Sequence, residues 1–221
     1  MLRLVTCLLL SLLVSLPARA ADPVYEVEVI AFVRSTDPAL HGGEDASLSS
    51  HRPSLDSGFE LDMLGGLPLN NLRLGNVAAR LKAGGKYQIL LHQAWRQPVG
   101  SSSSAPWLHL AAGSVTADGN SQPELEGLVK LYRNPNLMLD ADLLYRHLVT
   151  APTAAAAAPS QETQYAGSAD AATPSQPAAA AQPTLQLREY PLVGSSRVMD
   201  GQISYYDSPM LSLLVQAWPV K

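Results

Sequence analysis

The stretch "LEGLVKLYRNPNLMLDADL", residues 125–143, decides the fold because its pattern occurs twice in the chain. An offset of 74 residues aligns it with "MDGQISYYDSPMLSLLVQAW", residues 199–218. The residues that match in register are Glu126 and Asp200, Gly127 and Gly201, Tyr132 and Tyr206, Pro135 and Pro209, Leu137 and Leu211, Leu139 and Leu213. Because proline lacks an amide donor and suits turns, each copy predicts a hairpin, with turns at residues 133–135 and 207–209. The alternative, that two unrelated hairpins share this pattern by chance, remains open.

Three more strands are predicted from alternating side chains. The segment "VYEVEVIAFV", residues 24–33, alternates with a period of two. Its faces carry Tyr25, Val27, Val29 and Ala31 on one side and Glu26, Glu28, Ile30 and Phe32 on the other. Residues 87–97 and 107–112 predict two further strands, joined by a serine-rich loop over residues 100–106. Residues 35–55 predict another loop.

A helix is predicted over residues 72–83. Its apolar residues recur at helical spacing, namely Leu74, Val77, Ala78 and Leu81. Asn70 or Asn71 is a suitable N-cap, and Gly84 is a suitable end of the helix.

Residues 150–184 consist almost entirely of alanine, proline, threonine, serine and glutamine. Such a composition buries too little apolar surface to offset the entropy of ordering, so this segment predicts a disordered linker, most simply a spacer. The flanking residues, 21–149 and 185–221, are expected to share one sheet in one domain. The predicted fold class is α+β, with a mostly antiparallel sheet and at least one packed helix, interrupted by this insertion.

The first 20 residues predict a signal peptide. A basic start is followed by an apolar run, and Ala18-Arg19-Ala20 provides a cleavage pattern before Ala21. The run is too short to span a bilayer, so no membrane span is expected. The chain's one cysteine, Cys7, lies within this segment, so the exported protein is expected to have no disulfide and a periplasmic location.

Charge and motifs exclude several function classes. Removing Arg3 and Arg19 from the 15 basic residues leaves 13 against 19 acidic ones, a net charge of −6. No basic cluster follows, so nucleic-acid binding is not expected. Nucleophile-elbow, zinc-protease and phosphate-loop motifs are absent from the sequence. His41 and Glu44 come nearest to the spacing of metal ligands, but they lie in a predicted loop and do not match a known metal motif. No enzyme activity, catalytic residue, metal or cofactor is expected.

The segment "LLHQAWRQPV", residues 90–99, concentrates the chain's side-chain chemistry. As a strand, it places Ile89, Leu91, Gln93, Trp95 and Gln97 on one face and Leu90, His92, Ala94 and Arg96 on the other. A tryptophan between amides, next to arginine, can stack on and bond to a sugar or peptide ligand. The competing interpretation is that Trp95 covers the end of the core and Arg96 is simply solvated.

Three segments together resemble a known family. An exported start followed by "YEVEVIAF", then "LLHQAWRQPV", and finally "MDGQISYYDSPMLSLLVQAWPV" is similar to the CsiV family of periplasmic proteins. The resemblance implies a protein that binds peptidoglycan and supports wall synthesis through an outer-membrane lipoprotein activator of a bifunctional penicillin-binding protein. By this resemblance, the residues expected to bind the ligand are His92, Gln93, Trp95, Arg96, Gln97, Tyr205, Tyr206 and Asp207.

The sequence therefore predicts a non-enzymatic periplasmic adaptor with peptidoglycan as its main partner. Three alternatives remain: a wall hydrolase whose site assembles from distant residues, a protein-binding scaffold without wall affinity, and a carrier for an apolar ligand.

Overall fold

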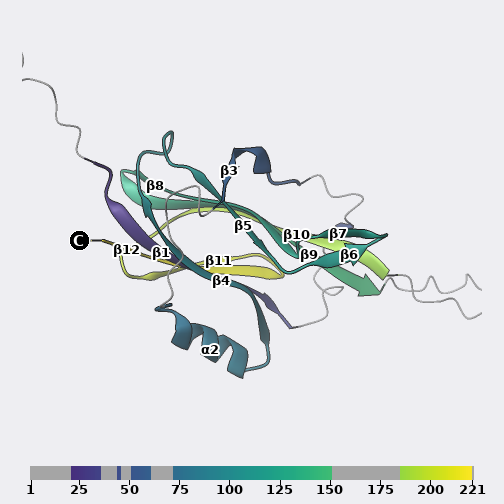
Figure 1. The fold of residues 1–221 in the computed structure, drawn as a ribbon. Coiled ribbons are helices and arrows are strands. Elements are labelled where there is room, and N and C mark those ends of the chain that lie inside the picture. Colours follow the sequence, from purple (N-terminus) through teal and green to yellow (C-terminus); the bar gives the residue numbers. More distant parts are fainter. Residues whose placement is uncertain (1–20, 36–43, 46–50, 61–71, 151–184, 221) are drawn as a thin grey trace, which may run out of the picture.

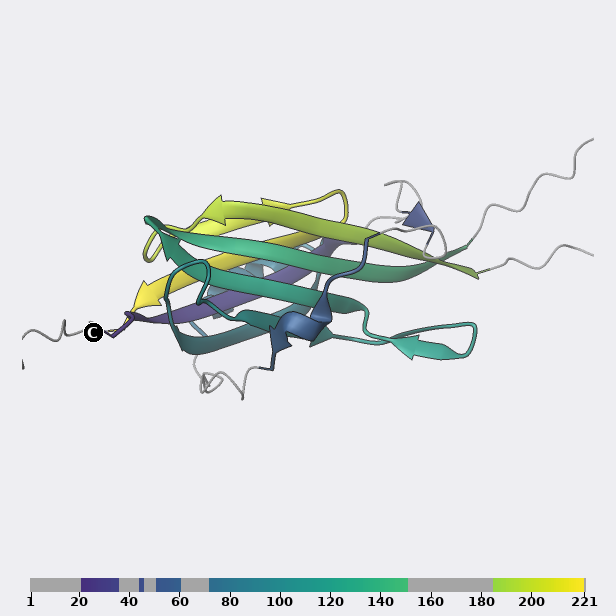
Figure 2. The same cartoon turned by 90° about the horizontal axis from the view of Figure 1, so that it is seen from above.

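Two β-sheets packed face to face form the body of the protein in the computed structural model (Figures 1 and 2). The structure describes residues 21–35, 44–45, 51–60, 72–150 and 185–220. The predicted signal peptide and almost all of the predicted linker lie outside these residues. The same is true of Asn70 and Asn71, and of His41.

The smaller sheet has four strands in the order β11-β12-β1-β4. These are β11 (Ile203–Asp207), β12 (Leu211–Pro219), β1 (Val24–Arg34) and β4 (Tyr87–Pro98), and all neighbours are antiparallel. The predicted strands over 24–33 and 87–97 are confirmed by β1 and β4.

The larger sheet has six strands in the order β2-β10-β9-β8-β5-β3. These are β2 (Glu44–Asp45), β10 (Leu185–Arg197), β9 (Asn136–Thr150), β8 (Leu125–Asn134), β5 (Trp107–Ala112) and β3 (Gly58–Phe59). A short 3-10 helix, η2 (Leu55–Ser57), precedes β3. Beyond β5, a separate hairpin consists of β6 (Val115–Ala117) and β7 (Asn120–Gln122).

The core lies between the two sheets and is built by strand alternation. Inward residues of the smaller sheet, such as Val27 and Leu213, pack with inward residues of the larger one, such as Leu139 and Leu192. These side chains are at most 3% exposed. Burial of apolar side chains on this scale, at about 25 cal/mol per Å² removed from water, is the main force that holds the sheets together.

The prediction of an α+β fold is wrong. The described part of the chain is mainly β, and its one α-helix, α2 (Gly75–Ala83), lies against the outer face of the smaller sheet (Figure 1). Leu74 and Ala78 pack there on Ile30 and Phe32. The helix is real but short, whereas long strands that the sequence only partly indicated, above all β10, make up the larger sheet.

Both predicted hairpins are confirmed, but they lie in different sheets. The first is β8 and β9, and the second is β11 and β12. Their repeated glycines have different roles, since Gly201 occupies a turn with a φ of 71° and Gly127 lies within a strand with a φ of 150°. A Cβ on Gly127 would approach the carbonyl oxygen of Asp142 to 2.2 Å. The shared pattern thus reflects two local solutions on the two halves of the sandwich.

Strands from both sides of the predicted linker pair with each other. β10 follows the linker and runs antiparallel to β9 over its whole length, from Leu185 opposite Thr150 to Arg197 opposite Met138.

Candidate functional site

Trp95 and Gln97, the centre of the predicted binding segment, point into the core. Trp95 is 0% exposed and Gln97 is 2% exposed. The indole Nε1 of Trp95 donates a hydrogen bond to Oε1 of Gln97 at 2.6 Å, and Nε2 of Gln97 donates to the carbonyl of Leu131 at 3.4 Å. Gln93 lies on the same inward face and is half-buried. The structure therefore places Trp95 and Gln97 where they hold the sheets together, without a surface for a ligand.

The alternation of β4 is interrupted by a bulge. The register of β4 against β1 shifts between Ala31 and Phe32, which face Leu91 and Ile89, respectively. Ile89 therefore packs beside Phe32 under the helix, although simple alternation placed it with Leu91 and Trp95. An extra residue in one strand reverses the facing of everything beyond it.

His92 lies on the outward face and has a structural partner. Its Nε2 is 2.7 Å from Oε1 of Glu28, whose side chain is only 1% exposed. Both carboxylate oxygens of Glu28 also accept backbone N–H bonds, from Arg73 at 2.8 Å and from Leu74 at 2.9 Å. Leu74 is the N-cap of α2, so its N–H is one of the donors that a helix start leaves without an intrahelical partner, and Arg73 directly precedes it. Glu28 thus caps α2 from the neighbouring strand, and His92 supports that cap.

Arg96 belongs to an ion-pair cluster on the same outward face. Its guanidinium donates through Nε and NH2 to Oε2 of Glu26, at 3.3 and 3.1 Å. Nε of Arg73 lies 2.9 Å from Oε1 of Glu26, and the Arg73 guanidinium stacks 4.6 Å above the ring of Trp218. The side chains of Arg73 and Arg96 are 52% and 53% exposed, whereas that of Glu26 is 7% exposed. Two exposed arginines are therefore fixed by one buried carboxylate.

The predicted residues of β11 divide between surface and core. Tyr206 is buried, and its hydroxyl donates to the carbonyl of Leu139 in the other sheet. Burial raises the pKa of Tyr206 to about 12. Tyr205 is 53% exposed, with its hydroxyl 3.2 Å from Oγ of Ser212. Asp207 is also exposed and pairs with Arg34 at 3.3 Å.

The structure does not bring the two predicted segments together. A cross-strand row runs from His92 through Ile30 and Leu214 to Tyr205. Three strand spacings separate the ends of this row by about 14 Å. The helix packs on Ile30 and Leu214 in between. His92 and Arg96 thus lie at one edge of the outer face, and Tyr205 and Asp207 lie at the other. Their ligand role stays a prediction.

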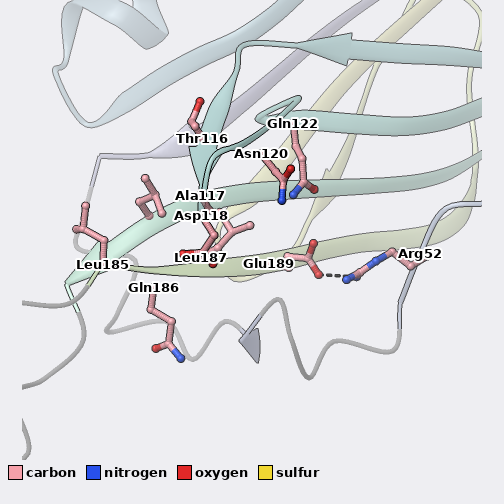
Figure 3. A pocket seen from close by; sticks show the side chains of 11 residues that line it. Arg52, Thr116, Ala117, Asp118, Asn120, Gln122, Leu185, Gln186, Leu187 and Glu189 are labelled. Atoms are coloured by element: carbon pink, nitrogen blue, oxygen red, sulfur yellow. Dashed lines mark hydrogen bonds and ion pairs between the residues drawn. The ribbon is translucent and has the colours of Figure 1, made fainter.

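A pocket that the sequence did not indicate lies on the other side of the sandwich (Figure 3). It has a volume of about 510 Å³, between the β6–β7 hairpin and the ends of β9 and β10. Its lining residues are Arg52, Thr116, Ala117, Asp118, Asn120, Gln122, Leu148, Leu185, Gln186, Leu187 and Glu189. This size is typical of sites for small ligands.

Several polar side chains at this pocket are not used by the fold. Among the described residues, the side chains of Asp118, Asn120 and Gln122 have no hydrogen-bond or ion-pair partner. Figure 3 shows all three on the hairpin, facing the β10 side of the pocket. A possible sequence signal is the Asp118-Gly119 dipeptide, because Asp-Gly is typical of two-residue hairpin turns.

A buried charge network supports the pocket wall. Glu189, whose side chain is 2% exposed, accepts hydrogen bonds from Arg146 at 3.1 Å and from Arg52 at 2.5 Å. Arg146 in turn donates to Glu126 at 3.0 Å. Because each buried charge here has an opposite partner, the network is compatible with burial and fixes Glu189 in place.

No group of three histidine, cysteine, aspartate or glutamate side chains within the described residues could hold a metal ion. No helix in this part of the chain is both long and apolar enough to cross a bilayer.

Comparison with known proteins identifies one family. The family model described as "Peptidoglycan-binding protein, CsiV" matches residues 62–220, more than half of the chain. The matched range includes β4, both repeated hairpins and every pocket residue except Arg52. The resemblance drawn from the sequence is thereby confirmed. Neither the curated proteins nor the solved structures compared with this chain gave a match.

Proposed function

Because this chain belongs to the CsiV family, we propose that it binds peptidoglycan in the periplasm and acts by recognition and positioning, without making or breaking a bond. Family membership over residues 62–220 is the observation that carries this proposal. A signal peptide over residues 1–20, as predicted from the sequence, supports the periplasmic location.

The pocket of Figure 3 is the part of the described surface best suited to bind the wall. It combines a concave shape with polar side chains that have no role in the fold, among them Asn120 and Gln122. Arg96 and Asp207 already have ion-pair partners, and Trp95 is buried. A ligand gains most from groups that it does not have to detach from existing partners.

We further propose that the outer face of the smaller sheet contacts a protein partner. The resemblance suggests an outer-membrane lipoprotein that activates a penicillin-binding protein. The exposed guanidinium groups of Arg73 and Arg96 occupy one part of this face, and Ile203 and Tyr205 occupy another, 45% and 53% exposed. Arginine and tyrosine are enriched in protein interfaces. The pocket lies against the larger sheet, so wall and partner could bind together.

Co-sedimentation of the full exported protein with purified sacculi tests the proposal. We expect the protein to sediment, with weaker sedimentation for Asn120→Ala and unchanged sedimentation for Arg96→Ala. Release of soluble muropeptides by the pure protein would show a hydrolase instead. A protein that stays in the supernatant but is retained by an envelope protein would be a scaffold without wall affinity.

A further inference from the structure

We propose that the pocket between the β6–β7 hairpin and β10 binds the peptide part of its ligand, and specifically a short peptide with a primary amine. In peptidoglycan this is the stem peptide, which contains alanine residues and a diamino acid. The inference rests on the proposed wall binding and adds to it which part of the wall this pocket recognises. Asp118 is assigned as the partner of the amine.

The hairpin that carries the polar groups has a defined geometry. Asp118 and Gly119 occupy its two-residue turn with positive φ values of 50° and 79°. Two consecutive positive φ values define the turn type that matches the twist of a tight hairpin. Ala117 faces Asn120 and Val115 faces Gln122 across the two strands. Asn120 and Gln122 therefore share one face because side chains of a strand alternate.

Amide side chains suit a peptide ligand. The side chains of Asn120 and Gln122 each offer two N–H donors and a carbonyl acceptor, which is the complement of a peptide bond. Leu148, Leu185 and Leu187 supply an apolar side of the pocket against which methyl groups can pack. None of the described residues that line the pocket is aromatic. The stacking surface that a sugar ring would favour is thus lacking there, and an amide-bonded ligand fits better.

The charges of the pocket favour an amine. Glu189 is neutralised by Arg146 and Arg52, which lie within hydrogen-bond distance of its two oxygens. Asp118 has no such cation among the described residues and lies in an exposed turn at the rim of the pocket. A carboxylate without a partner attracts an ammonium group, and a charge-assisted hydrogen bond is about twice as strong as a neutral one.

Binding of four soluble probes to the full exported protein tests the inference. The probes are N-acetyl-L-Ala-γ-D-Glu-L-Lys-D-Ala, whose one primary amine is on lysine, and the same peptide acetylated on that lysine as well. An α-linked all-L peptide of the same composition and chitotetraose in its fully N-acetylated form complete the set. By isothermal titration calorimetry we expect the peptide with the lysine amine to bind, and the peptide acetylated on lysine to bind about tenfold more weakly. Any affinity for chitotetraose should be the same in wild type and in a variant of this pocket. In wild-type protein, NMR should show the side-chain amide signals of Asn120 and Gln122 shifting with the peptide that has the lysine amine.

Two aspartate substitutions provide the variant and its control. Asp118→Asn removes the charge, and asparagine tolerates the positive φ of this turn, so peptide affinity should fall about tenfold with little change in folding. Asp56→Asn removes an exposed charge in η2, outside the pocket lining, and should leave affinity unchanged.

The possible failures can be told apart. If sacculi still sediment the protein but the peptide neither binds nor shifts the amide signals, the inference is wrong and wall binding stands. If Asp118→Asn lowers the affinity for chitotetraose and leaves the affinity for the peptide unchanged, the pocket recognises sugar. Equal binding of an α-linked all-L peptide of the same composition would point to a protein segment as the occupant. If sacculi are not bound either, the proposed function itself fails.

Discussion

Replacing Trp95 should weaken the fold while leaving the wall binding of the folded fraction intact. The ring is fully buried, and loss of a buried aromatic side chain to alanine costs about 3–5 kcal/mol. The same change leaves Oε1 of Gln97 without its donor, which adds about 1–3 kcal/mol. The total of about 4–8 kcal/mol approaches the whole stability of a typical domain, about 5–15 kcal/mol. Trp95→Ala is therefore expected to be mostly unfolded or close to it.

Trp95→Phe separates packing from ligand contact. It keeps most of the ring volume and loses the indole donor, so we expect the free energy of unfolding to fall by about 2–4 kcal/mol. Urea denaturation followed by circular dichroism measures this loss, and Trp218→Phe is the matched control. Trp218 is half-buried at the surface under Arg73, so its substitution should cost less than about 1 kcal/mol.

Sedimentation with sacculi, compared at equal folded fraction, completes the test. Trp95→Phe should bind as wild type does. The reasoning is refuted if Trp95→Phe loses less than about 0.5 kcal/mol of stability and fails to sediment, because Trp95 would then act on the ligand and not on the core.

Three further predictions concern single side chains. Glu28→Gln should lower the free energy of unfolding by about 2 kcal/mol. One carboxylate oxygen becomes an NH2 group, which is a donor and cannot accept from the N–H of Arg73 or Leu74 that faces it. Thermal denaturation measures the loss, and an unchanged melting temperature would contradict the cap. Gly127→Ala should abolish folding or severely reduce the yield of soluble protein, because a Cβ would lie 2.2 Å from the carbonyl oxygen of Asp142. Gly75→Ala in α2 is the control, because a Cβ there meets nothing within 4 Å, and this change should be neutral or slightly stabilising. Burial raises the pKa of Tyr206 to about 12 from 10.0. Its contribution, about 2–3 kcal/mol, is thus fully present below pH 10 and is lost as the pH rises towards 12; urea denaturation across this range should show a smaller decline for Tyr206→Phe.

Strand alternation made the strands of the smaller sheet predictable, together with β5, β8 and β9 of the larger one. The pattern of β1 gave both of its faces correctly, including the outward Glu26 and Glu28. The helix was found as well, although α2 begins at Gly75 and not at residue 72. Its cap was not predictable, because the acceptor is the side chain of Glu28, 46 residues from Leu74 in the sequence. Local rules search for caps only within a few residues of the helix start.

β10 shows why fold class was misjudged. It contains Pro191 and Gly194 and follows an alanine- and proline-rich stretch, so its sequence does not resemble a central strand. Proline is tolerated in a strand where one edge is unpaired. Among the described residues, β2 pairs with Arg188 and Glu189 only, so no described strand covers the outer edge of β10 at Pro191. The strand is held by its long pairing with β9, a non-local property that composition does not show.

The burial of Trp95 and Gln97 in the predicted binding segment was not predictable for a related reason. Alternation divides β4 into two faces, but it does not say which face meets the second sheet. A tryptophan between amides suggests a ligand site when it is exposed, yet in this fold Gln97 satisfies the indole of Trp95 inside the core. What distinguishes a ligand site from such a core network is polar groups left without protein partners. The sequence does not reveal this property. It is recognisable only in the folded structure, where Asp118, Asn120 and Gln122 lie next to β10, a strand more than 60 residues later in the chain. The pocket, and not the most conspicuous segment of the sequence, is therefore the place where a search for the wall ligand should begin.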